Sequence, residues 1–204
     1  MTIRFVLASA SPARLRTLRE AGLRPQVIVS DVNENAIIDE IGSAPTSALT
    51  QRLAEAKATA VAAGLDGPAV VLGCDSMLEL DGESLGKPGS SGEAMKRWDR
   101  MRGSNGVLHT GHCLIDVETG RGIVTDAATT VSFADVSDAE IALYTATGEP
   151  TRVAGAFTID GLGGWFVRGV KGDHHNVVGL SLPLVRDMLV ELGYSLSDVG
   201  YPSV

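Results

Sequence analysis

The first residues that could do chemistry form a hydroxyl-rich segment near the N-terminus, Ser9-Ala10-Ser11-Pro12-Ala13-Arg14. An apolar run over residues 3–7 predicts a buried strand before it, and an apolar stripe at helical spacing predicts a helix after it. Ser11 suits the N-cap of that helix and Pro12 its first position. Because free backbone N–H groups and the positive end of the helix dipole attract anions, we interpret the segment as a phosphate site. The alternative is an ordinary capped helix with solvated arginines.

Two acidic residues could act on a bound phosphate. Asp75 follows the apolar strand predicted for residues 69–72, and a carboxylate at the end of a buried strand is a common metal ligand or general base. Glu34 lies in a predicted acidic loop with Asp31, where both carboxylates and several waters could hold Mg²⁺. The alternatives are a carboxylate that caps the next turn at Asp75 and a merely solvated loop around Glu34.

Two lysines could neutralise the charge of such an anion. Lys87 lies in Leu85-Gly86-Lys87-Pro88, on the return strand of a hairpin predicted from the turn Asp81-Gly82. Glycine permits close backbone approach and proline stiffens the exit, so the ammonium would be held in place against a phosphate oxygen. Lys57 lies between small residues on a predicted helix, with room to reach across a cleft. An ordinary surface lysine is the alternative at both positions.

The histidines and cysteines do not form a metal-ligand pattern. His109 and His112 lie three apart on a predicted strand, where such positions point to opposite faces of the sheet. Cys74 and Cys113 lack metal-ligand spacing, and two cysteines predict no disulfide framework and fit a reducing compartment. The sequence also has no Walker A motif and no GxSxG motif.

The composition limits the class of protein and the kinds of partner. Hydrophobic residues make up 44% of the chain and charged residues 21%, as in soluble globular proteins. The formal net charge of -8 argues against nucleic acid as a partner, because binding its backbone needs a broad basic patch. Apolar runs are too short for a membrane span, and the N-terminal one is too short for a signal peptide. We expect a cytoplasmic protein without nucleic-acid or membrane partners.

Hydrophobic periodicity and turn signals predict a series of strands and helices. Strands are expected over residues 3–7, 26–29, 69–72, 77–80, 83–85, 107–117, 122–133, 155–160 and 165–170. Helices are expected after Ser11, from Pro45 to Gly64, over 91–102, from the capping box at Ser137 to about 147, and over 182–192. The apolar stripe of the helix before Gly64 is read as Leu49, Leu53, Ala56 and Ala60. Hairpins together with crossover connections indicate an α/β or α+β fold with a mixed sheet.

Separated motifs in a defined order point to a known family. They are Ser9-Ala10-Ser11-Pro12-Ala13-Arg14, Glu34 after Asp31-Val32-Asn33, Lys57, Gly73-Cys74-Asp75-Ser76, Leu85-Gly86-Lys87-Pro88, His109-Thr110-Gly111, and the stretches 154–161 and 176–183. In this order they resemble the Maf family of nucleoside triphosphate pyrophosphatases over about residues 3–192. Ala13 departs from the family's pair of arginines, which removes one possible phosphate contact. Asp160 stands where the branch that prefers dTTP and UTP carries Gln.

The resemblance implies a fold, an activity and a cofactor. The implied fold is an elongated mixed β-sheet flanked by helices, with two lobes around a deep central cleft, in a single domain over 1–204. The implied activity is hydrolysis of a nucleoside triphosphate to the monophosphate and pyrophosphate by a cytoplasmic enzyme, often dimeric, with Mg²⁺ or Mn²⁺. The family has also been linked to septum formation and to removal of non-standard nucleotides.

The resemblance also implies roles for individual residues. Asp75 is expected to be the catalytic base and, with Glu34, to hold the metal. The triphosphate is expected to contact Ser9, Ser11, Arg14, Lys57 and Lys87. Asp160 is expected to recognise the base, and because a carboxylate only accepts hydrogen bonds, it complements the two donors of a guanine edge, as in GTP or 7-methyl-GTP. Trp165 nearby either stacks on that base or belongs to the core.

Three other functions stay open on the sequence alone. They are a non-catalytic nucleotide-binding regulator of cell division, a pyrophosphatase that prefers dTTP or UTP, and an enzyme that releases orthophosphate. The pair of acids, Glu34 and Asp75, favours an enzyme over a regulator. The enzymatic interpretation requires Arg14, Glu34, Asp75 and Lys87 to lie around one hollow large enough for a polyanion.

Overall fold

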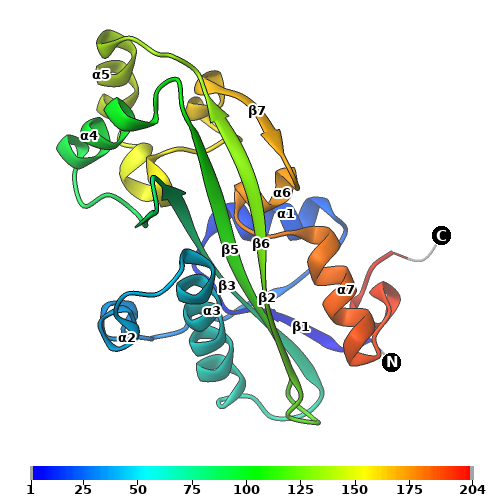
Figure 1. Ribbon diagram of the computed structural model, residues 1–204. Helices are drawn as coiled ribbons and strands as arrows, with labels where there is room; N and C mark the ends of the chain where they lie inside the picture. The colour runs from blue at the N-terminus through cyan, green and yellow to red at the C-terminus, as the bar shows by residue number, and fades with distance from the viewer. Residues whose placement is uncertain (1, 203–204) are drawn as a thin grey trace. The chain divides into compact units, whose positions relative to one another are not determined.

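A mixed β-sheet connects the elements of this computed structural model, which describes residues 2–202 (Figure 1). The single-domain prediction also includes residues 1, 203 and 204, which lie outside the described residues. The strands are β1 (Arg4–Leu7), β2 (Gln26–Val27), β3 (Ala69–Leu80), β4 (Glu83–Leu85), β5 (Asn105–Asp116), β6 (Gly122–Phe133) and β7 (Val167–Lys171). The helices are α1 (Pro12–Glu20), α2 (Glu34–Ile41), α3 (Thr46–Ala62), α4 (Ser91–Met101), α5 (Asp138–Ala146), α6 (His174–Val178) and α7 (Leu182–Leu192).

The strand order is β2-β1-β3-β5-β6-β7, with β4 paired to β3 beside this path. The pairs β1–β2 and β1–β3 are parallel, whereas β3–β4 and β6–β7 are antiparallel. The predicted mixed sheet in an α/β fold is therefore confirmed. Among the described residues, no helix combines the length and the apolar character needed to cross a bilayer.

The chain divides into two compact units. The first comprises Met1–Asp75, Thr110–Ala127 and Gly179–Val204, and the second comprises Ser76–His109 and Ala128–Val178. Strands β3, β5 and β6 contribute residues to both units. A division into two units agrees with the expected two lobes, and the cleft expected between them stays a prediction.

The first unit buries both faces of its strands. Phe5 and Leu7 of β1 belong to a core with residues of α1 and α7, whereas Val6 and Ala8 belong to a core with residues of α3. Figure 1 shows α3 on one side of these strands and α7 on the other. Successive side chains of a strand point to opposite faces, so a strand covered on both sides is a continuous apolar run. This explains the uninterrupted apolar sequence over residues 5–8.

Helix α3 lies unusually close to the strands that it covers. A Cβ added at Gly73 of β3 would come within 3.0 Å of the backbone of Ala54, and one added at Gly111 of β5 within 3.0 Å of the backbone of Thr50. Real Cβ atoms essentially never make such contacts, so the two glycines permit this packing. Gly73 and Gly111 therefore determine the distance between α3 and the sheet.

The buried face of α3 differs from the predicted stripe. Ala60 is exposed and Ala56 is half-buried, whereas Ala54, Lys57 and Ala58 are buried. Only small side chains fit where the helix backbone approaches Gly73. The face of α3 that lies against the sheet is therefore the one that carries Ala54 and Ala58, not the one that carries Ala56 and Ala60. The alternative that placed Lys57 on the surface is wrong. Lys57 lies on the buried face of α3, where its side chain contacts Asp75 of β3.

The second unit has its core around Trp98 of α4. The Trp98 ring lies edge-on to Phe133, Tyr144 and Phe166 at centroid distances of 5.8, 5.6 and 5.6 Å, and its indole N–H donates to the carbonyl of Ala156 at 2.9 Å. Edge-to-face packing is favourable for aromatic rings, and the hydrogen bond satisfies the buried indole N–H. The predicted burial of Ala94, Trp98 and Met101 is confirmed.

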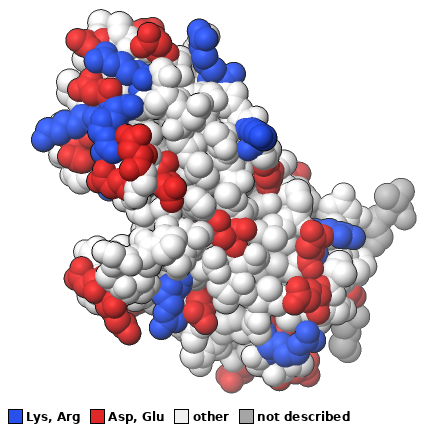
Figure 2. Space-filling view, in the orientation of Figure 1, with Lys and Arg blue, Asp and Glu red and all other residues white. Residues whose placement is uncertain are grey.

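Charged side chains on the outside of this unit alternate in sign. On the face shown in Figure 2, Lys and Arg side chains are interspersed with Asp and Glu. Three arginines of α4 and the residue that follows it form ion pairs, Arg97 with Glu93, Arg100 with Glu83 and Arg102 with Asp138. The pair of Arg100 with Glu83 is exposed on both sides, and an exposed pair of this kind adds little stability.

Several local predictions are confirmed because a side chain within the same segment determines them. The Ser11 hydroxyl caps α1 by accepting from the Arg14 amide at 3.4 Å, with Pro12 in the first turn. Ser137 and Glu140 form the predicted capping box of α5. The hairpin of β3 and β4 turns at Asp81-Gly82, where both residues have positive φ.

Other predictions are wrong. The strands expected over 69–72 and 77–80 are one strand, β3, so Asp75 lies within a strand rather than after its end. Residues 155–160 form a short 3-10 turn and irregular chain instead of a strand, because Gly155 and Ala156 adopt φ of 66° and 64°. The strand expected over 165–170 begins at Val167, since Trp165 lies in the 3-10 helix Leu162–Phe166.

Two short helices were not predicted. Glu34 is the first residue of helix α2, and the Asn33 side chain caps this helix by accepting from the Ala36 amide. No residue of α2 is buried, so the sequence has no apolar stripe that would indicate a helix there. Helix α6 has only five residues. The 3-10 helix Leu196–Val199 likewise lies in a segment without a clear sequence signal.

We expect Gly111→Ala to lower the free energy of unfolding by about 3 kcal/mol or more, because the new methyl group would overlap the backbone of α3. This loss is at or above the largest destabilisation that is typical of an overpacked core. Urea unfolding followed by tryptophan fluorescence measures this loss. The matched control is Gly92→Ala in α4, where the nearest atom to the new methyl would be 3.9 Å away and alanine favours the helix. Equal stability of Gly111→Ala and the wild type would contradict the close packing of α3.

Candidate functional site

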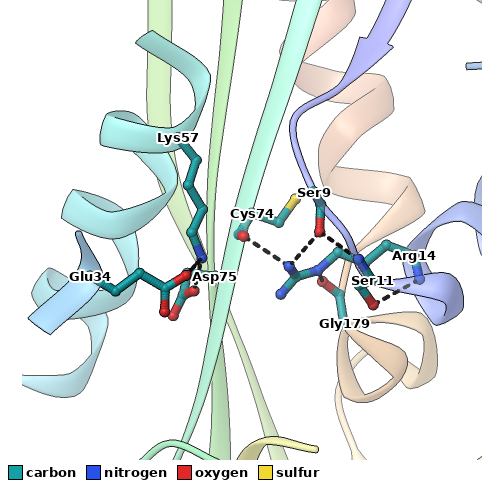
Figure 3. Close-up of polar contacts among 8 residues, drawn as sticks. All are labelled: Ser9, Ser11, Arg14, Glu34, Lys57, Cys74, Asp75 and Gly179. Carbon is teal, nitrogen blue, oxygen red and sulfur yellow. Dashed lines mark hydrogen bonds and ion pairs between the residues drawn. The ribbon is translucent and has the colours of Figure 1, made fainter. Parts of the chain in front are cut away.

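A buried ion-pair cluster joins β3, α2 and α3 in the first unit. The Lys57 ammonium of α3 hydrogen-bonds to the Asp75 carboxylate of β3 and lies 2.8 Å from Oε1 of Glu34, the first residue of α2 (Figure 3). Lys57 and Asp75 are each only 8% exposed, whereas the Glu34 side chain is 52% exposed. The cluster is therefore closed toward the sheet and open at Glu34.

The cluster carries two carboxylates for one ammonium. Buried charges are tolerated only when paired, and the opposite charges of Lys57 and Asp75 compensate each other. Removing either partner would leave the other charge buried and uncompensated. The unequal number of charges leaves an excess of one negative charge beside an open position, which favours a second cation or a cation-bearing ligand.

The carboxylate oxygens of Glu34 and Asp75 are the donors that could hold a metal. Hard divalent cations prefer oxygen ligands, and Mg²⁺ is commonly bound through one or two carboxylates together with substrate phosphates and waters. Both carboxylates already converge on one cation, the Lys57 ammonium, so this donor set fits such an ion. Within residues 2–202, no group of three or more His, Cys, Asp or Glu side chains is placed to hold a metal.

Arg14 forms a second polar cluster on the other side of β3 (Figure 3). Its Nη1 donates to the Cys74 carbonyl at 2.9 Å and to the Ser9 hydroxyl at 3.2 Å, and its Nε donates to the Gly179 carbonyl at 2.7 Å. The Ser11 amide also donates to the Ser9 hydroxyl, at 3.2 Å. Arg14 is 9% exposed, so the alternative of a solvated arginine is wrong at this position.

Consecutive residues of β3 connect the two clusters. The Cys74 carbonyl points toward Arg14 and the Asp75 side chain points toward Lys57, as Figure 3 shows. The structure thus brings together five of the predicted site residues besides Asp75: Ser9, Ser11, Arg14, Glu34 and Lys57. A basic group and an acid–base cluster held by one strand could bind a phosphate chain and activate a nucleophile beside it.

The other two predicted site residues belong to the second unit. Lys87 is exposed just after β4, and Asp160 is exposed and accepts a hydrogen bond from the Thr158 hydroxyl. Trp165 is 87% exposed, so the alternative that placed it in the core is wrong. Its stacking on a base stays a prediction.

One carboxylate holds the loop that carries Asp160 and Trp165. Glu149 accepts from the Tyr144 hydroxyl at 2.8 Å, from the Gly163 amide at 2.9 Å and from the Leu162 amide at 3.0 Å. Burial, followed by the hydrogen bond to Glu149, raises the pKa of Tyr144 and keeps it a donor. Sequence reasoning did not single out Glu149, because its partners are mostly backbone amides of a distant loop.

Comparison with known proteins agrees with this arrangement of motifs. The family model described as "Maf-like protein" matches residues 4–192. The chain belongs to the Maf family. This membership confirms the resemblance drawn from the motifs.

Close relatives of this Maf-family chain carry a common name. A "Nucleoside triphosphate pyrophosphatase" of Salinispora tropica is 52% identical over 98% of this chain and 88% of its own length. One of Streptomyces coelicolor is 52% identical over 98% of this chain and 96% of its own length. Among solved structures, the Staphylococcus aureus Ham1 protein matches with a TM-score of 0.46 and 18% identity, over 65% of this chain and 72% of its own.

Sequence reasoning missed two residues as partners of Arg14. Cys74 contributes its backbone carbonyl, which any residue type could provide, so the sequence contains no signal for it. Gly179 has φ of 130°, and a Cβ there would lie 3.3 Å from Nε of Arg14. A glycine in the stretch 176–183 is the one signal that could have indicated close approach.

Both cysteines of the first unit have free, buried thiols. Burial, only partly offset by Arg14 and then Lys57, raises the pKa of the Cys74 thiol to about 11, and burial, then Glu55, raises that of Cys113 to about 12. Because the thiolate is the reactive form, we expect neither to react with iodoacetamide in the native protein at about pH 8. Both should react after unfolding, as measured by mass spectrometry of tryptic peptides.

Thr59→Cys, on the exposed face of α3, provides the control because its thiol is accessible in the native state. Labelling of native Cys74 as fast as that of the introduced cysteine would contradict the raised pKa.

Proposed function

We propose that this chain hydrolyses a nucleoside triphosphate to the monophosphate and pyrophosphate. The observation that carries the proposal is the buried Lys57–Asp75 pair with Glu34 at its open side, one residue along β3 from the anchor of Arg14. The names of the relatives from Salinispora and Streptomyces support this class of reaction. A cytoplasmic location, a homodimer, the lack of nucleic-acid or membrane partners and a role in septum formation remain predictions from the sequence.

The proposed chemistry is attack of water on the α-phosphorus. Asp75 accepts the proton of the attacking water, and its burial beside the cationic Lys57 holds the carboxylate in place for that step. Lys57 and Arg14 offset the negative charge of the phosphates, and the hydroxyls of Ser9 and Ser11 orient phosphate oxygens. Pyrophosphate is the leaving group, so positioning and charge neutralisation provide most of the rate acceleration.

A divalent metal completes the proposed site. Glu34 and Asp75 would hold Mg²⁺ or Mn²⁺, which neutralises phosphate charge when bound. Lys57 contacts both carboxylates, so it must share them with the metal or turn toward a phosphate oxygen. Since a lysine ammonium is a mobile point charge on a flexible stem, either response is open to it.

Residues of the second unit are proposed to recognise the remainder of the nucleotide. Lys87 binds a phosphate oxygen, and Asp160 accepts two hydrogen bonds from a guanine-like base. The exposed ring of Trp165 is available for stacking on that base, including a cationic methylated one. Glu149 supports this role because it orders the loop that carries both side chains.

We expect Asp75→Asn to lower kcat about 10²–10³-fold, the typical cost of losing one positioned group of the active site. Phosphorus NMR with MgCl₂ should identify the wild-type products as monophosphate and pyrophosphate. The control is Asp66→Asn, an exposed acid of the same unit, which should retain wild-type turnover. Release of orthophosphate, or nucleotide binding without turnover, would contradict the proposed reaction, and undiminished turnover of Asp75→Asn would remove Asp75 from its role.

We expect the wild type to prefer GTP and 7-methyl-GTP over UTP and dTTP in kcat/KM. Asp160→Gln should shift this ratio toward the pyrimidines about tenfold or more, because an amide pairs with one donor and one acceptor and a charged hydrogen bond is lost. Steady-state kinetics with the four nucleotides measures the ratio. Asp173→Asn, outside the loop, is the control for charge alone. A pyrimidine preference of the wild type would overturn the role of Asp160.

A further inference from the structure

We propose that His112 is a positioning residue for Arg14, acting through the turn Gly179-Leu180-Ser181. The proposal rests on the proposed function, in which Arg14 contacts the triphosphate. His112 lies on β5 in the first unit and is fully buried. The turn precedes α7 in the same unit, so a side chain of the sheet reaches a loop distant in sequence.

The partners of the imidazole determine its protonation. Nε2 of His112 lies 2.9 Å from the backbone nitrogen of Ser181, and Nδ1 lies 2.9 Å from the carbonyl oxygen of Thr110. A backbone N–H only donates, so Nε2 must accept and carries no proton. A carbonyl only accepts, so Nδ1 carries the proton. His112 is therefore a neutral imidazole in one tautomer, with an acceptor directed at the turn.

The bond from His112 fixes the start of α7. Ser181 is the N-cap of this helix, and its hydroxyl accepts from the Leu184 amide at 3.2 Å. The Ser181 amide precedes the helix, so no carbonyl of α7 can accept from it. Ser181 is buried, and an amide without an acceptor at such a place would be destabilising. His112 supplies that acceptor.

The same turn presents a carbonyl to Arg14. Leu180 is fully buried in the core of the first unit and anchors the middle of the turn. The Gly179 carbonyl, two residues before the amide held by His112, accepts from Nε of Arg14 at 2.7 Å. The φ of 130° at Gly179 turns the chain so that this carbonyl and the Ser181 amide serve different partners. Fixing the amide of Ser181 therefore fixes the acceptor that orients the guanidinium.

The requirement for an acceptor explains a histidine at this buried position. His109 and His112 lie three residues apart on β5, where side chains point to opposite faces of the sheet, so a shared metal ion does not explain them. The two histidines also belong to different units of the chain, with His109 facing Glu79 in the second. A leucine would fill the volume at residue 112 but offer no acceptor, whereas a glutamine would retain one.

We expect His112→Leu to raise KM for the nucleoside triphosphate about tenfold, with kcat changed less than about threefold, because Arg14 loses orientation in the bound state. His112→Gln should recover most of the loss. The decisive measurement is a double-mutant cycle with Arg14→Lys, which keeps the charge but loses the planar fork. In that background, His112→Leu should have no further effect on KM.

The controls separate positioning from stability. Urea unfolding of each variant identifies conditions in which all are folded, and Thr145→Val, at a buried polar side chain of the second unit, should leave KM unchanged. Equal KM values for His112→Gln and His112→Leu, or an additive effect in the Arg14→Lys background, would overturn the inference. An unchanged KM of His112→Leu would do the same.

A nucleoside α,β-methylene triphosphate distinguishes this inference from the proposed function. Its Kd, measured by calorimetry, should follow the same cycle as KM. If the wild type binds this analogue but hydrolyses no nucleotide, the proposed reaction fails, and the cycle in Kd still decides the role of His112. If the wild type does not bind the analogue, both proposals fail.

Discussion

The close contact of helix α3 with the sheet is the constraint on which the candidate site depends. Gly73 and Gly111 allow the backbone of α3 to approach β3 and β5 more closely than any side chain would permit. At this distance Lys57 is buried and meets Asp75 directly. A side chain larger than glycine would separate the helix from the strands and with them the two charges, so the chemistry of the site depends on the absence of two methyl groups.

The two polar clusters stabilise their buried charged groups in different ways. Lys57 and Asp75 compensate each other's charge, and Glu34 adds a more exposed carboxylate at the edge. For Arg14, the acceptors at Cys74, Ser9 and Gly179 are neutral dipoles, which orient the guanidinium. The first cluster suits proton transfer and cation binding, and the second suits binding of a phosphate.

Hydrogen bonds with backbone groups hold Arg14 in the first unit and the Asp160 loop in the second. Arg14 is held by a strand, a loop and the turn before α7, and His112 fixes that turn from β5. In the second unit, Glu149 fixes the loop with Asp160 through two amides and one hydroxyl. In each unit a side chain orders a loop by accepting hydrogen bonds from its amides, which offsets the entropic cost of ordering that segment.

The sequence by itself determined the features that depend on neighbouring residues. These are the caps at Ser11 and Ser137, the hairpin at Asp81-Gly82 and the order of motifs that indicated the Maf family. Only the tertiary structure decided the burial of Lys57, the place of Asp75 within a continuous strand and the acceptors of Arg14. The physical reason is that these depend on the separation between distant backbones and on carbonyl groups, which every residue type carries and which therefore leave no trace in the sequence.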